Sequence, residues 1–214
     1  MEFDPRLVHP FPCIVAGPTG SGKTVFVKTL LSGREQYIDG PPEYILWCYG
    51  EYQSMFAELQ LQFPSIEFHE GLPKDIKDKL DFRKRNMIVI DDLMTELGDD
   101  KRVTHLFSKG SHHRNCSVLF LTQNLFHKGK ENRNFSLNAH YIVLFKSPRD
   151  SSAVRNLAQQ MYPGKHKFLL EAYADATAKP FGYLLIDLKQ TTPDQLRLRA
   201  NIFEPCVDVY VPSI

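Results

Sequence analysis

The stretch that decides the fold is Cys13–Thr24, with the sequence CIVAGPTGSGKT. Its first residues are apolar, as in a buried strand, and Gly17–Thr24 then matches the pattern G-x-x-x-x-G-K-[ST]. Residues 25–31 repeat apolar side chains with the spacing of a helix. A glycine-rich loop between a strand and a helix points backbone N–H groups and the positive helix end at a phosphate chain. The stretch therefore predicts a phosphate-binding loop of the Walker A type.

Every residue of this loop is a candidate nucleotide contact: Gly17, Pro18, Thr19, Gly20, Ser21, Gly22, Lys23 and Thr24. In such loops the lysine reaches the β- and γ-phosphates, and the final hydroxyl holds Mg²⁺. Lys23 and Thr24 are assigned these two roles. The guanine-reading motif Asn-Lys-x-Asp does not occur in the sequence, which disfavours a Ras-like GTPase. ATP and Mg²⁺ are the expected cofactors.

A second apolar run, Asn86–Asp92 with the sequence NMIVIDD, ends in two carboxylates. This pattern is typical of the Walker B strand. Asp91 is expected to bind Mg²⁺ through water, and Asp92 is expected to polarise the attacking water. Many ATPases place Glu at the second position, and Asp is one methylene shorter. Glu96 therefore stays an alternative catalytic base.

A third apolar run, Leu119–Asn124, ends in two amides and is a candidate sensor strand. In open α/β sheets the ligand lies beyond the carboxyl ends of the parallel strands. Gln123 or Asn124 is therefore expected to contact the γ-phosphate or the lytic water.

The remaining apolar runs, Tyr44–Cys48, Tyr141–Phe145 and Tyr183–Ile186, are continuous rather than alternating, which indicates strands buried on both faces. Segments with helical spacing separate them. The chain is therefore expected to be one α/β domain, residues 1–214, with a mostly parallel central sheet flanked by helices. Residues 1–12 are expected to form an N-terminal arm, and residues 206–214 an edge strand or a docking tail.

Composition is ordinary for a globular domain: the 214 residues are 43% hydrophobic, and 26 Lys and Arg balance 25 Asp and Glu. The net charge of +1 gives no reason to expect a nucleic-acid partner. The charge is unevenly distributed, however. Residues 43–100 carry a net charge of −7, whereas residues 101–134 carry seven basic side chains and one acidic. This basic segment surrounds the sensor strand.

The four cysteines lie far apart without a C-x-x-C pair, which indicates a reducing, intracellular compartment. The N-terminus has acidic residues where a signal peptide needs basic ones, and no apolar run approaches the ~18 residues of a membrane span. A membrane partner is not expected.

With these motifs in place, the chain resembles the viral genome-packaging ATPases of the poxvirus and Polinton (Maverick) type, a branch of the FtsK/HerA superfamily of P-loop ATPases. The resemblance covers most of the chain. The segments that carry it are Ala16–Thr24, Ile90–Leu93, Gly110–Asn115, Phe120–Asn124 and Gly182–Asp187. It implies a RecA/FtsK-like domain in a homo-oligomeric ring, a pentamer or hexamer, that hydrolyses ATP to drive double-stranded DNA into a preformed capsid. It also implies a capsid protein as partner, and the host nucleus or cytoplasm, or the virion, as location.

Ring ATPases of this type complete each site with an arginine from the neighbouring subunit, which stabilises transition-state charge. Arg114, just ahead of the sensor strand, is the first candidate for this arginine finger. Arg149, after the next strand, is the alternative.

The basic stretch after the sensor strand is the candidate DNA interface. Lys128, Lys130 and Arg133 are expected to contact backbone phosphates in a central pore, as translocation without sequence preference requires. Two other functions share the phosphate loop and stay open at this point. They are a P-loop kinase of a small metabolite and a nucleotide-dependent regulatory switch.

Overall fold

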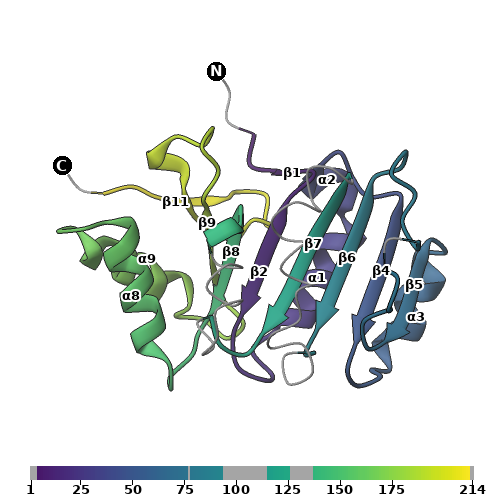
Figure 1. Cartoon of the computed structure of the whole chain (residues 1–214). Helices are drawn as coiled ribbons and strands as arrows, with labels where there is room; N and C mark the ends of the chain where they lie inside the picture. Colours follow the sequence, from purple (N-terminus) through teal and green to yellow (C-terminus); the bar gives the residue numbers. More distant parts are fainter. Residues whose placement is uncertain (1–3, 77, 94–114, 126–136, 213–214) are drawn as a thin grey trace.

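The computed structural model describes residues 4–76, 78–93, 115–125 and 137–212 (Figure 1). Its centre is a nine-stranded sheet in the order β11-β10-β9-β8-β2-β7-β6-β4-β5. The strands of this sheet are β2 (Pro12–Ala16), β4 (Tyr44–Tyr49), β5 (Ile66–Glu70), β6 (Asn86–Asp91), β7 (Cys116–Thr122), β8 (Tyr141–Phe145), β9 (Tyr183–Asp187), β10 (Leu198–Ala200) and β11 (Asp208–Tyr210). Two short strands, β1 (Leu7–Val8) and β3 (Ile38–Asp39), pair separately.

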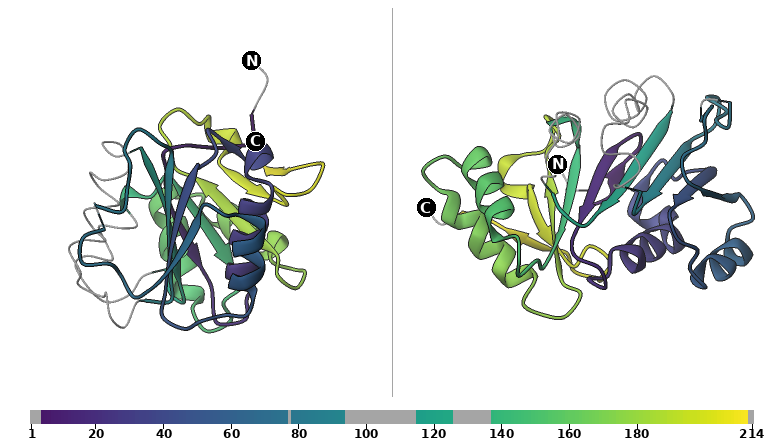
Figure 2. Two further views of the ribbon diagram at one scale, coloured as in Figure 1. Left: turned by 90° about the vertical axis from the view of Figure 1, so that its right-hand side faces the viewer. Right: turned by 60° about the horizontal axis from the view of Figure 1, so that its bottom comes forward.

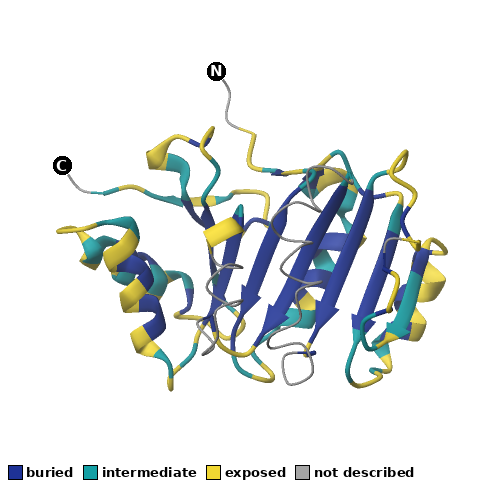
Figure 3. Ribbon diagram, in the orientation of Figure 1, coloured by how far each residue is buried: buried dark blue, intermediate teal, exposed yellow. Residues whose placement is uncertain are grey.

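The sheet is mostly parallel, as the sequence predicts. Six neighbouring strands pair in parallel, in the order β5, β4, β6, β7, β2 and β8. Strands β9, β10 and β11 extend the sheet beyond β8 with antiparallel pairing. Nearly every residue is buried in five of these parallel strands, β2, β4, β6, β7 and β8 (Figure 3). Burial on both faces explains why these strands have continuous apolar sequences.

Successive residues of each central strand pack on opposite faces of the sheet. On one face, Phe26 and Leu30 of α1 (Lys23–Ser32) and Phe56 of α3 (Met55–Gln62) join the apolar cluster. On the other face, Leu157 of α8 (Ser151–Met161) and Leu169 of α9 (His166–Ala176) join a second cluster. Figure 2 shows the two sets of helices on opposite sides of the sheet. A further short helix, α2 (Arg34–Tyr37), follows α1, and a 3₁₀ turn covers Asp194–Leu196.

Helix α8 begins one residue after its cap. The side chain of Asp150 accepts a hydrogen bond from the backbone N–H of Ala153 at 3.2 Å, which satisfies one of the free donors of the first turn. Ser151 and Ser152 both lie inside the first turn of the helix.

Strand β11 lies within the C-terminal residues 206–214. Strand β11 pairs antiparallel with β10, and the Tyr210 hydroxyl donates to the Asp175 carboxylate of α9 at 2.7 Å. The strand therefore belongs to the sheet of its own chain. In the described part of the chain, no helix has the length and apolar character needed to span a bilayer.

Candidate nucleotide-binding site

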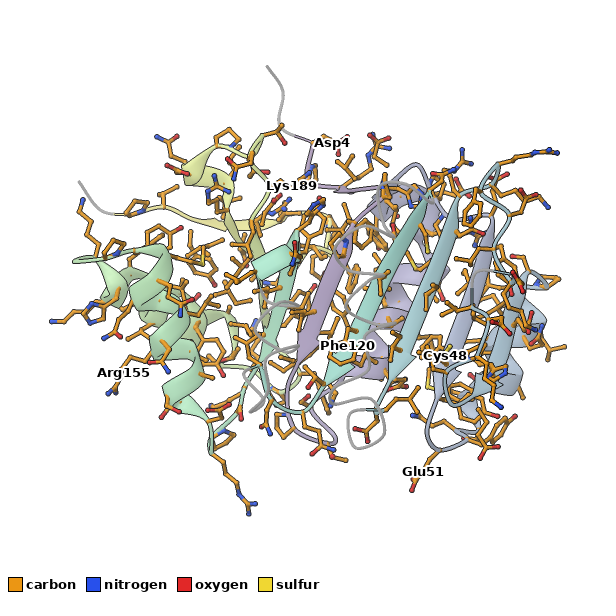
Figure 4. All side chains as sticks on the ribbon, viewed as in Figure 1. Asp4, Cys48, Glu51, Phe120, Arg155 and Lys189 are labelled. Atoms are coloured by element: carbon orange, nitrogen blue, oxygen red, sulfur yellow. The ribbon has the colours of Figure 1, made fainter. Side chains whose placement is uncertain are left out.

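Strand register brings the three motifs to one edge of the sheet. Ala16 of β2 pairs with Thr122 of β7, and Leu121 of β7 pairs with Asp91 of β6. The phosphate loop, the two carboxylates and the sensor amides therefore follow the carboxyl ends of three adjacent parallel strands. Figure 4 shows Glu51, which follows β4, below this edge of the sheet. This is the position at which open α/β sheets bind ligands.

The glycines of the phosphate loop are required by its geometry. Gly20 and Gly22 have φ angles of 76° and 107°, in the left-handed region that side chains disfavour. A Cβ atom on Gly17 would lie 2.6 Å from both the Phe145 Cβ and the Ser21 Oγ. The Gly17 N–H also donates to the Thr122 carbonyl at 3.1 Å, which fastens the start of the loop to β7.

Lys23 is the first residue of α1, and its ammonium group lies over the loop. The Nζ atom donates to the carbonyl oxygens of Gly17 at 2.7 Å and Pro18 at 3.1 Å. Burial lowers the pKa of Lys23, and the negative charges of Asp92 and Asp91 partly oppose this shift. The cation is therefore held between the loop and the two carboxylates.

Asp91 ends β6 and is almost fully buried, whereas Asp92 is exposed. The pKa of Asp91 is raised to about 6, mainly by burial and also by the charge of Asp92, while the charge of Lys23 acts in the opposite direction. Asp92 has a φ of 53°, a left-handed conformation that Asp tolerates better than most residues. Strained backbone of this kind is frequent at functional sites.

Gln123 contacts the candidate base directly. Its Nε2 atom donates to the Asp92 Oδ1 atom at 3.3 Å. Asn124 is exposed, and its backbone N–H donates to the Thr122 hydroxyl at 3.3 Å, so this residue closes the turn after β7. Of the two candidate sensor amides, the structure brings Gln123 to the carboxylates.

Gln53 is a polar residue at the site that the sequence does not predict. The Gln53 Nε2 atom lies 3.5 Å from the Asp91 Oδ2 atom, at the limit of a hydrogen bond. Gln53 belongs to no motif. Its only sequence signal is its place four residues after the apolar strand β4, beyond the same edge of the sheet.

The available ligands fit a nucleotide with Mg²⁺. Thr24 supplies a hydroxyl in the first turn of α1, and Asp91 and Asp92 supply carboxylates, the oxygen donors that Mg²⁺ prefers. The buried Ser21 Oγ atom in the loop has no hydrogen-bond partner among the described residues. A bound phosphate would satisfy a hydroxyl at this position.

Several predicted residues lie outside the described part of the chain: Glu96, Arg114, Lys128, Lys130 and Arg133. Arg149 is described and exposed, and it follows β8 at the nucleotide edge. Asn115, the neighbour of Arg114, precedes β7 at the opposite edge. At about 3.3 Å per strand residue, Asn115 lies roughly 25 Å from Gln123 of the same chain.

The fold is similar to the folds of several solved NTPases and ATPases. The genome packaging NTPase B204 from Sulfolobus turreted icosahedral virus 2, in complex with ATP-gammaS, matches with a TM-score of 0.58 and 10% identity over 95% of this chain and 98% of that one. The DNA-packaging ATPase B204 from Sulfolobus Turreted Icosahedral Virus matches with a TM-score of 0.57 and 10% identity over 96% and 100% of the two chains. The cytoplasmic domain of the Type VII Secretion ATPase EccC from Thermomonospora curvata gives 0.56 and 13% identity over 88% of this chain and 25% of that one.

No protein-family model matches the sequence, and no curated protein sequence matches it. The likeness therefore rests on the fold, which this chain shares over almost its whole length with the viral packaging NTPase. The predicted α/β fold is confirmed, and at the level of the fold so is the resemblance to viral packaging ATPases.

Proposed function

We propose that the chain is a Mg²⁺-dependent ATPase that works in a homo-oligomeric ring and translocates double-stranded DNA into a preformed viral capsid. The observation that carries the proposal is the convergence of Lys23, Asp91, Asp92 and Gln123 beside a phosphate loop at one sheet edge. The full-length likeness to a packaging NTPase supports the choice of DNA as the cargo.

Each side chain has a role that its position supports. Lys23 binds the terminal phosphates, and Thr24 with Asp91 would hold Mg²⁺, which neutralises charge that develops on the phosphates. Asp92 accepts the proton of the attacking water, and Gln123, which contacts Asp92, orients that water.

A neighbouring subunit supplies the arginine finger in this proposal. Arg114 is the first candidate, because its neighbour Asn115 lies at the sheet edge remote from the nucleotide of the same chain. Arg149, at the nucleotide edge, is the alternative. Lys128, Lys130 and Arg133 contact the DNA backbone, and a capsid protein anchors the ring in the infected cell's nucleus or cytoplasm, or at the virion.

The test is ATP hydrolysis by the full chain with and without long duplex DNA. We expect strong stimulation by DNA, and a loss of turnover of about 10²–10⁴-fold in whichever of Asp92→Asn and Glu96→Gln removes the base. The other variant is the matched control. A phosphorylated small-molecule product would instead identify a kinase, and negligible turnover with tight nucleotide binding would identify a regulatory switch. Either result overturns the proposal.

A further inference from the structure

A pocket opens beside the phosphate loop on the side away from the carboxylates. Its volume is about 430 Å³, within the range of small-molecule sites. The loop residues 18–21 form one wall, and residues 177–182, between α9 and β9, form the other. Lys146, the residue after β8, completes the lining. Because one wall is the phosphate loop itself, a ligand held by that loop extends directly into this pocket.

An aromatic ring in this pocket is held outward by an unusual backbone. Phe181 is 69% exposed and has a φ of 62°, a conformation that bulky side chains rarely adopt. The next residue is required to be glycine, because a Cβ atom on Gly182 would lie 2.4 Å from the Ala176 carbonyl oxygen. The Gly182 N–H donates to the Lys179 carbonyl at 3.1 Å and closes the turn. Strain of this kind persists where the surrounding structure imposes it, and it is concentrated at ligand sites.

Phe181 also touches the phosphate loop. Its Cδ1 atom would lie 3.3 Å from a Cβ atom on Gly22, the residue that caps α1. A side chain at position 22 would crowd the ring, and glycine adopts the φ of 107° found there without strain. The ring is therefore packed against the loop on one side while most of its surface stays open to the pocket.

The sheet order fixes which end of a nucleotide reaches this pocket. Asp91 ends β6 and Gln123 follows β7, both on one side of β2, and this is where the terminal phosphate must lie for hydrolysis. The other end of the nucleotide then points across β2 toward β8 and β9. Lys146 follows β8, and Phe181 precedes β9.

We propose that this pocket receives the base and ribose of the bound nucleoside triphosphate, and that the exposed ring of Phe181 is the platform on which the base stacks. Among the described residues that line the pocket, Lys146 and Lys179 are charged and none is acidic. A basic, partly apolar pocket suits a base joined to phosphates. Aromatic rings stack on bases without hydrogen bonds, so the platform contributes affinity more than selectivity between bases. This inference rests on the proposed binding of ATP.

The test compares ATP with inorganic tripolyphosphate, which has the phosphates but no base. Isothermal titration calorimetry of the full chain with Mg²⁺ measures both dissociation constants. We expect Phe181→Leu to weaken ATP binding by roughly 5- to 100-fold, from the loss of one stacked base, and to leave tripolyphosphate binding unchanged. Phe181→Tyr keeps the ring and should bind ATP like the parent. Phe82→Ala, which removes another exposed ring outside the pocket, is the matched control.

Two results would overturn the proposal that the base stacks on Phe181. Equal weakening of ATP and tripolyphosphate by Phe181→Leu would mean that the ring only supports the phosphate loop. Unchanged ATP affinity in the same variant would place the base elsewhere. Both results are read from binding by the variant and leave ATP hydrolysis by the parent intact. They are therefore distinct from a failure of the proposed function, in which the parent shows no ATP hydrolysis stimulated by DNA.

Discussion

Asp91 is a carboxyl group that the fold buries at the end of β6, and burial raises its pKa to about 6. The folded chain without nucleotide and metal therefore binds a proton more tightly than the unfolded chain, in which the pKa is near 3.8. By linkage, this group lowers the stability of the fold as the pH rises from about 4 to 6, by a total of roughly 3 kcal/mol. A bound cation offsets this loss of stability because it favours the charged carboxylate. The buried carboxylate therefore destabilises the empty fold but contributes affinity for the cation.

Asp91→Asn tests this account at the level of one residue. In EDTA and without nucleotide, the variant should gain stability over the parent, and the gain should be up to about 2 kcal/mol larger at pH 7.5 than at pH 4.5. Urea unfolding at the two pH values measures the difference. A gain that does not change with pH would show that Asp91 has an ordinary pKa in the folded chain.

The sequence places the candidate site residues at the ends of apolar strands, and parallel strands of similar length end at a common edge. Lys23, Asp91, Asp92 and Gln123 do meet there. Sequence patterns did not predict Gln53 or Phe181. The contact of Gln53 with Asp91 depends on how the loop after β4 folds back. The outward position of the Phe181 ring depends on a left-handed backbone that no local sequence pattern indicates.

At the scale of elements, the central strands were predictable in place and length because burial on both faces makes their sequences continuously apolar. The edge strand β5 has the sequence IEFHE with three half-buried positions, so its pattern is weak. Strands β1 and β3 are two residues each and form through pairing with each other. Such elements depend on tertiary contacts rather than on local sequence.

A buried ion pair joins β9, β10 and the N-terminal arm. The Arg199 Nη2 atom lies 2.8 Å from the Asp187 Oδ2 atom, and the Nη1 atom donates to the Pro5 carbonyl at 2.9 Å. The two side chains are 1% and 4% exposed. This pair fixes the arm across the edge of the sheet opposite the nucleotide; Figure 4 shows Asp4 and Lys189 at that edge.

Arg199→Met should cost roughly 3–5 kcal/mol of unfolding free energy, because it leaves the Asp187 carboxylate buried without its cation. The double variant Arg199→Met/Asp187→Leu should recover most of that loss. Lys28→Met is the matched control, because its ion pair with Glu58 is exposed and should contribute less than about 1 kcal/mol. Urea unfolding measures all three. A double variant as unstable as the single one would show that the loss does not come from leaving the Asp187 carboxylate without its cation.

At the scale of the whole molecule, the net charge of +1 is compatible with DNA binding because the charge is segregated. Residues 43–100, which include the Walker B carboxylates, are acidic, and residues 101–134 are basic. In the function that we propose, copies of this chain form the ring, and DNA and a capsid protein are its partners.

The most direct measurement of this function is displacement of a triplex-forming oligonucleotide from linear duplex DNA by the full chain with ATP and Mg²⁺. We predict displacement that requires hydrolysis, is lost in Lys23→Ala, and is reduced in Lys128→Ala/Lys130→Ala with ATP affinity unchanged. ATP hydrolysis without displacement, at low salt and on long duplexes, would contradict the claim that this chain moves DNA.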